Sequence, residues 1–85
     1  LSLLGYKELN YQKGISRLHE EKAEEENERL KREMLLVEEI DDDGIHVDEH
    51  IRYVLSEYRS LTEEQKIRFN EHIKEHKTRI ENRSK

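Results

Sequence analysis

The sequence contains no cysteine, no proline and no tryptophan, and only three of its 85 residues are glycine. Without cysteine, neither a disulfide nor a thiolate metal site can form. No stretch approaches the roughly 18 apolar residues that a membrane-spanning helix needs, so we expect no membrane partner. Hydrophobic residues make up 32% of the chain, and a chain this short buries only about 60% of its unfolded surface. We therefore expect no catalytic core and predict that the chain is not an enzyme.

Charged residues are abundant, at 44% of the chain, and the mean hydropathy is −1.19. A composition rich in Glu, Lys, Arg and Leu is typical of long helices and coiled coils, so we predict an all-α fold. The chain begins at Leu1 and its one methionine is Met34. We therefore expect a fragment, a processed product or part of a longer chain.

Apolar spacing divides the chain into three parts. Residues 1–40 are predicted to form a long, charged, amphipathic helix, with apolar positions three and four residues apart. Residues 41–46 are predicted to form an acidic turn, because three aspartates oppose the dipole at the end of a helix and Asp-Gly favours a turn. Residues 47–85 are predicted to form an antiparallel hairpin of two helices, since the link between them is short. Thr62 and Gln65 match a capping box at the start of the last helix.

The apolar stripes of these helices are the expected contact surfaces for other subunits or for the rest of a parent chain. Helical spacing of three and four residues places each set on one face. The expected interface residues are Leu30, Met34, Val37, Ile51, Val54, Tyr58, Phe69, Ile73 and Ile80.

Opposite charges are concentrated in different segments. Residues 34–51 contain seven acids and no Lys or Arg, whereas residues 66–85 contain seven bases. These segments are either solvated surfaces or complementary surfaces that meet within the chain or between subunits. The formal net charge of −5 gives no reason to expect direct DNA binding.

Four of the five histidines form two pairs at i, i+4: His46 with His50, and His72 with His76. This spacing lets two imidazoles on one helix face reach one zinc ion. Three features argue against a metal site. His46 is expected at or before the start of its helix, and His76 lies within an apolar stripe. Structural zinc also usually binds thiolates. We therefore assign no metal ligand or cofactor, and expect His50 and His72 to satisfy polar groups beside the hairpin interface. If a metal binds, an acid such as Asp48 or Glu75 is expected to complete its site.

Segment 41–52, from Asp41-Asp42-Asp43-Gly44 to His50-Ile51-Arg52, resembles the C-terminal region of tailed-phage portal proteins. The segment His72-Ile73-Lys74-Glu75-His76 is similar to a second motif of that region, and the acidic run through Glu28 is similar to the helix before it. The resemblance implies a ring-forming structural protein through which DNA is packaged and ejected. Its partners would be proteins, including copies of itself, and DNA would be involved only through the assembly. The protein would be located in the virion or the host cytoplasm. The alternatives are a free-standing coiled-coil or scaffolding-type protein and a histidine-based metal-binding module.

Overall fold

The computed structural model describes the backbone of residues 2–84 and the side chains of residues 14–84. It contains three helices, α1 (Ser2–Leu30), α2 (Asp43–Ser56) and α3 (Glu63–Ser84), and no strand within residues 2–84. The prediction of an all-α fold is confirmed. No helix in this range is long and apolar enough to cross a lipid bilayer.

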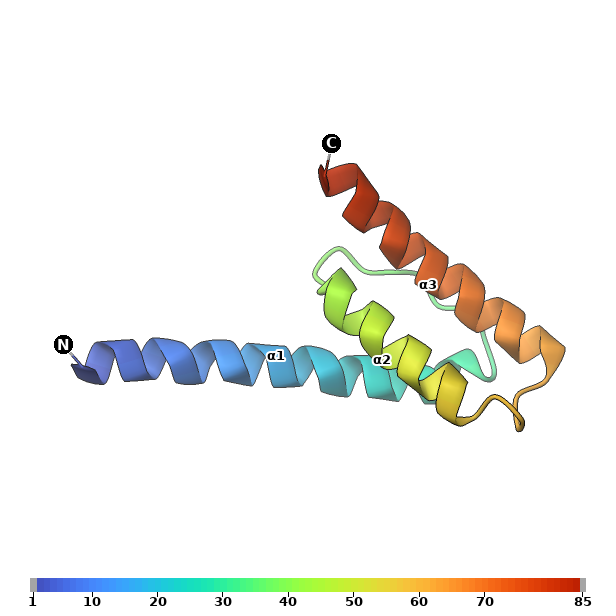
Figure 1. Cartoon of the computed structure of the whole chain (residues 1–85), viewed down its shortest axis with the longest axis horizontal. Coiled ribbons are helices and arrows are strands. Elements are labelled where there is room, and N and C mark those ends of the chain that lie inside the picture. Colours follow the sequence, from blue (N-terminus) through green and yellow to red (C-terminus); the bar gives the residue numbers. More distant parts are fainter. Residues whose placement is uncertain (1, 85) are drawn as a thin grey trace.

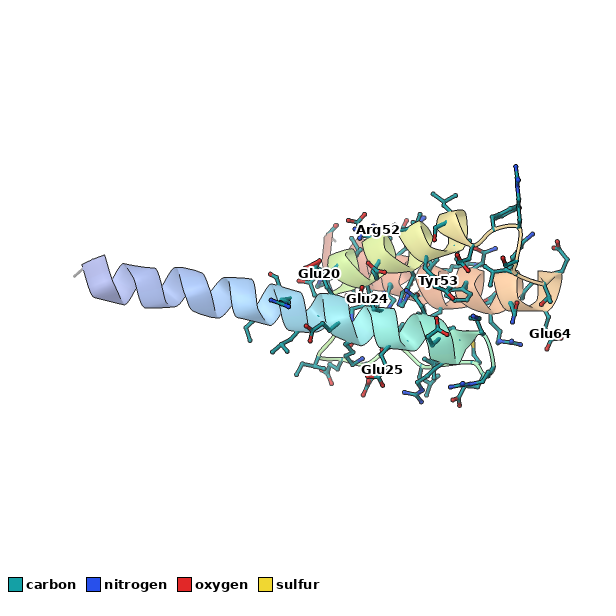
Figure 2. All side chains as sticks on the ribbon, turned by 90° about the horizontal axis from the view of Figure 1, so that it is seen from below. Glu20, Glu24, Glu25, Arg52, Tyr53 and Glu64 are labelled. Atoms are coloured by element: carbon teal, nitrogen blue, oxygen red, sulfur yellow. The ribbon has the colours of Figure 1, made fainter. Side chains whose placement is uncertain are left out.

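The helices pack around one end of α1. The C-terminal half of α1 lies against α2, and α2 and α3 lie side by side with opposite directions, while the N-terminal half of α1 extends beyond both (Figure 1). Charged side chains surround this bundle, including Glu20, Glu24 and Glu25 of α1 (Figure 2). The interior therefore forms only where the three helices overlap.

The first helix ends at Leu30 and not at residue 40, so the predicted extent of this helix is wrong. The backbone amides of Arg32 and Glu33 both bond to the carbonyl of Arg29, which closes the last turn. The next carbonyls, of Leu30 and Lys31, accept hydrogen bonds from the Arg68 guanidinium at 2.8 and 2.6 Å. A cation at this end of a helix also opposes the negative end of its dipole. The end of α1 is therefore fixed by this contact with α3 and not by a signal in the local sequence.

The second helix begins at Asp43 and not at Val47. Asp42 is its N-cap, and the Asp42 side chain accepts a hydrogen bond from the amide of Ile45 at 3.0 Å. Aspartate is favoured at an N-cap, and Asp43 adds negative charge to the first turn, where the helix dipole stabilises it. The acidic run therefore starts α2 and does not end the preceding helix.

A connection without helical structure, residues 31–42, crosses the surface of α3. The α3 side chains bind its carbonyls in the order of the chain: Gln65 and Arg68 near Lys31, His72 at Leu35, and Arg79 at Glu38 and Glu39. Backbone groups buried away from water require such partners. The predicted capping box at the start of α3 is confirmed, with reciprocal bonds of 2.9 and 3.1 Å between Thr62 and Gln65.

The interior contains more polar than apolar side chains. Its apolar part centres on Leu30 and Phe69, with Tyr53 stacked on Phe69 at a ring-centroid distance of 5.6 Å. The buried apolar residues are Ala23, Leu30, Leu35, Leu61, Phe69 and Ile73. The buried polar residues are Glu26, Asn27, Asp41, Asp43, His46, Glu49, His50, His72 and His76. A small apolar core is thus combined with an unusually polar interior.

Replacement of Leu30 by Ala tests the apolar core. Leu30 is 0% exposed, whereas Leu55 on α2 is 70% exposed. We expect Leu30→Ala to lower the free energy of unfolding by about 2–5 kcal/mol, and Leu55→Ala to change it by less than about 0.5 kcal/mol. Urea unfolding followed by circular dichroism measures both. Equal losses for the two variants would contradict this core.

Candidate metal centre

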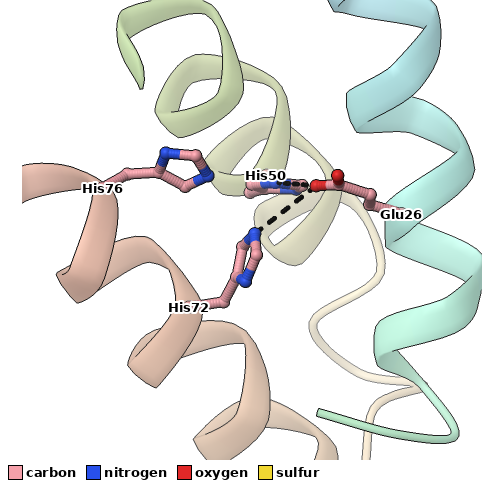
Figure 3. A group of neighbouring side chains, drawn as sticks. All are labelled: Glu26, His50, His72 and His76. Carbon is pink, nitrogen blue, oxygen red and sulfur yellow. Dashed lines mark ion pairs between the residues drawn. The ribbon is translucent and has the colours of Figure 1, made fainter. Parts of the chain in front are cut away.

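Four histidines and one glutamate meet inside the bundle. Because α2 begins at Asp43, His46 lies within the helix, and it shares a face with His50. His72 and His76 are on the facing side of α3, and Glu26 approaches from α1 (Figure 3). The four histidines are 0% exposed and Glu26 is 5% exposed. The objection that His46 precedes its helix is therefore wrong.

Three of the rings are held by their Nδ1 atoms. Nδ1 of His72 lies 2.8 Å from the carbonyl oxygen of Leu35. This oxygen can only accept, so the hydrogen of a neutral His72 ring is on Nδ1. Nδ1 of His76 lies 2.6 Å from Oδ1 of Asp43, a carboxylate that likewise accepts. In the neutral form of each ring the other nitrogen, Nε2, then carries no hydrogen.

The ring of His50 is also held through its Nδ1 atom. Its Nδ1 lies 2.7 Å from Oδ1 of Asn27. The amide group of Asn27 is oriented by Glu49, because Nδ2 donates to the Glu49 carboxylate at 3.4 Å, so its oxygen faces His50. The Nε2 atoms of His50, His72 and His76 are all buried and without a hydrogen-bond partner among the described residues.

Two of these nitrogens lie against the same carboxylate oxygen. Oε1 of Glu26 lies 3.3 Å from Nε2 of His50 and 3.4 Å from Nε2 of His72 (Figure 3). Donor atoms of these three residues and of His76 all lie within 4.8 Å of one another. Lone pairs that face each other at such distances repel, unless a proton or a metal cation lies between them. Neighbouring ligands of a tetrahedral zinc ion, with bonds of about 2.0–2.1 Å, are about 3.3–3.4 Å apart.

Burial and neighbouring charges favour, in three of these groups, the protonation state in which the group can bind a metal. Burial lowers the pKa of both His50 and His76, and nearby imidazoles lower each further. Burial alone would raise the pKa of Glu26, but the neighbouring imidazoles of His46, His50 and His72 and the ammonium group of Lys22 hold it well below its usual range. Neutral rings around an ionised carboxylate are the forms that bind a metal.

His72 differs from the other two rings. Burial favours its neutral form, yet Glu26 and the carbonyl of Leu35 outweigh burial and raise the pKa of His72. His72 is thus the ring at which a proton competes most strongly with a metal ion.

A second group of acidic side chains lies beside this cluster and contacts the ammonium group of Lys22. The ammonium group of Lys22 lies 2.6 Å from Oε2 of Glu26, 2.7 Å from Oδ1 of Asp41 and 2.9 Å from Oε1 of Glu38. Burial opposes the charged amine, but these carboxylates raise the pKa of Lys22 above its ordinary value. His46 lies between the two groups, 3.2 Å from Glu26 and 3.5 Å from Asp41.

The acidic and basic segments meet within the chain. Asp43 holds His76 with Oδ1, and its Oδ2 accepts from Arg83 at 2.5 Å and lies 3.4 Å from Nε of Arg79. Burial opposes ionisation of Asp43, but His76 and Arg83 lower its pKa. Of the two alternatives for these segments, solvated surfaces or complementary surfaces, the structure shows contact within the chain at Asp43. It also fixes the carboxylate that orients a candidate ligand.

The acids of the cluster are not the ones expected from the sequence. Asp48 and Glu75 are exposed, whereas Glu26, Asp41 and Asp43 are buried. Glu26 does carry a sequence signal. Ala23, Glu26 and Leu30 are spaced by three and four residues, so Glu26 occupies a position of the buried stripe of α1 where an apolar residue is usual.

The expected interface residues have two different locations. Leu30, Phe69 and Ile73 are buried in the core of the chain itself, and Val54 packs against that core. Val37, Ile51 and Ile80 are partly buried. Met34 and Tyr58 are exposed, at 46% and 54%, so the prediction of outside contacts applies to these two most directly.

Comparison with protein-family models, curated proteins and solved structures finds no match for the chain. Function must therefore be inferred from the geometry of the cluster.

Proposed function

We propose that the chain is a metal-binding helical module whose ion is held by Glu26, His50, His72 and His76. The observation that supports this is a buried group of one carboxylate and three imidazoles, in which Nε2 of His50 and of His72 face the same oxygen of Glu26 and a donor atom of His76 lies within 4.8 Å of the others. Burying polar groups without partners costs free energy. A divalent cation at their common centre turns this cost into four metal–ligand bonds.

Zinc is the ion that this donor set suits best. Imidazole nitrogen and carboxylate oxygen both bind zinc, and the separations of Glu26 Oε1 from Nε2 of His50 and of His72 agree with a tetrahedral site. The anchored Nδ1 atoms match the usual arrangement at metal sites, in which the second ring nitrogen donates to a carboxylate or a carbonyl. For His76 that partner is Asp43, and for His72 it is the carbonyl of Leu35.

The proposed role of the ion is structural. All four coordination positions are taken by side chains that are at most 5% exposed, whereas catalytic zinc sites keep an open position for water or substrate. The ligands come from all three helices, so the ion joins α1, α2 and α3 at one point. Because the apolar core is small, metal binding would supply a large share of the folding free energy.

Addition of zinc to the metal-free chain tests this proposal. At free zinc 100-fold above Kd we expect a stabilisation of about 2.7 kcal/mol, which corresponds to a rise in Tm of about 10 °C or more for a domain of this size. Thermal melts followed by circular dichroism, with and without a chelator, measure the rise. Calorimetric titration should give one zinc per chain.

Two variants and one control make this test specific. Glu26→Gln removes the ligand charge but keeps the shape, and His72→Ala removes one ring. Each should weaken zinc binding by more than the roughly 10–100-fold that loss of an outer-shell partner costs. His19→Ala removes the histidine that lies outside both candidate ligand groups and should leave the affinity unchanged. An identical Tm with zinc and with chelator would refute the metal site. So would a zinc affinity of Glu26→Gln and His72→Ala that equals the affinity of the His19→Ala control.

The second candidate function is an assembly module, and the two proposals are compatible. We infer it from the resemblance to the C-terminal region of phage portal proteins, with a long first helix that precedes a helical hairpin. An exposed apolar groove on α1 and the connection favours it, lined chiefly by Ile15, Leu18 and Ile40. A second copy of the chain is the proposed partner in such a ring, in the virion or the host cytoplasm, and the ion would hold each copy in shape.

Substitution of Leu18 tests the assembly role. Leu18 is 60% exposed in the groove, and Leu55 is 70% exposed on α2. We expect Leu18→Asp to lower the mass measured by light scattering to that of one chain, because a buried carboxylate disfavours the contact. Leu55→Asp should keep the wild-type mass. A wild-type chain that is monomeric up to millimolar concentration would contradict self-assembly through this groove.

A further inference from the structure

We propose that Lys22 fills a second cation position next to the first ion, and thereby limits the chain to one metal ion. This proposal rests on the metal site proposed above. The second position is formed by Glu26, Asp41 and His46, with His76 at its border, and donor atoms of these four residues lie within 4.8 Å of one another. Glu26 and His76 belong to both groups, so the two positions are adjacent.

His46 shows that this position is more than a group of acids. The His46 ring is 0% exposed, and neither of its nitrogens has a hydrogen-bond partner among the described residues. Nδ1 lies 3.2 Å from Oε1 of Glu26, and Nε2 lies 3.5 Å from Oδ1 of Asp41. A neutral ring has only one N–H, so one buried nitrogen beside these carboxylates is bare and is available as a ligand.

The ammonium group of Lys22 occupies the place that a bridged second ion would need. Glu26 directs Oε1 to the first group of imidazoles, and Oε2 lies 2.6 Å from Nζ of Lys22. Asp41 also contacts Lys22, at 2.7 Å through Oδ1, the oxygen that faces His46. In two-metal sites a pair of ions is about 3.5–4 Å apart, and a carboxylate such as Glu26 would bridge them. Lys22 supplies one positive charge there and leaves no room for a dication.

Removal of this charge should open the second position. Lys22→Met keeps most of the apolar stem and removes the ammonium group. After saturation with zinc and gel filtration, elemental analysis should find one zinc per wild-type chain and two per Lys22→Met chain. Lys77→Met, at an exposed lysine of α3, is the matched control and should keep one zinc. Addition of Asp41→Asn to Lys22→Met should return the count to one.

The fold of each variant is checked by circular dichroism with excess zinc. The second ion replaces the lost charge, so Lys22→Met should be as helical as the wild-type chain under these conditions. A folded Lys22→Met chain with one zinc, a Lys22→Met chain that stays unfolded with excess zinc, or a wild-type chain with two zinc ions would each overturn the role of Lys22. A wild-type chain with no zinc would instead refute the metal site itself.

Discussion

The mutual repulsion of buried lone pairs is the constraint on which the rest of this structure depends. The neutral rings of His50 and His72 present bare Nε2 atoms to Oε1 of Glu26, and His76 lies beside them, all of them buried. Their Nδ1 atoms are already committed to Asn27, Leu35 and Asp43, so the rings cannot turn to relieve the contact without losing those bonds. The cation that we propose at the centre would convert the repulsion into attraction. Such an ion would account for so polar an interior beside so small an apolar core.

The surrounding structure serves to orient these ligands. The connection 31–42 lies along α3, and His72 holds one of its carbonyls while Arg79 holds two others. Asp43 is the N-terminal residue of α2, orients His76 and is itself held by Arg83. The path from Arg83 through Asp43 to His76 resembles the carboxylate–histidine arrangement common at metal sites. The acidic and basic segments of the chain are therefore part of the architecture of the site, and loss of either would disturb a ligand.

Sequence reasoning predicted the helical class, the capping box of α3 and the two histidine pairs, because each depends on spacing within one helix. It misplaced the end of α1 and the start of α2, since Arg68 closes the first helix through a contact between distant residues. It also set aside the histidine pairs, because His46 was expected at or before the start of α2, His76 lies in an apolar stripe, and structural zinc usually binds thiolates. Glu26 was not identified as a ligand because only the packing of α1 against α2 and α3 shows which carboxylate points inward. The sequence did contain one signal for Glu26, which is a polar residue at a position of the buried stripe of α1.

The most direct test of this account is the protonation state of the ring nitrogens, measured by long-range ¹H–¹⁵N NMR of the histidines before and after one equivalent of zinc. With zinc, His50, His72 and His76 should each keep a hydrogen on Nδ1, and the Nε2 resonances should move to metal-bound positions, while His19 is unchanged. Hydrogens on Nε2 of these three rings, or resonances that do not respond to zinc, would contradict the central claim.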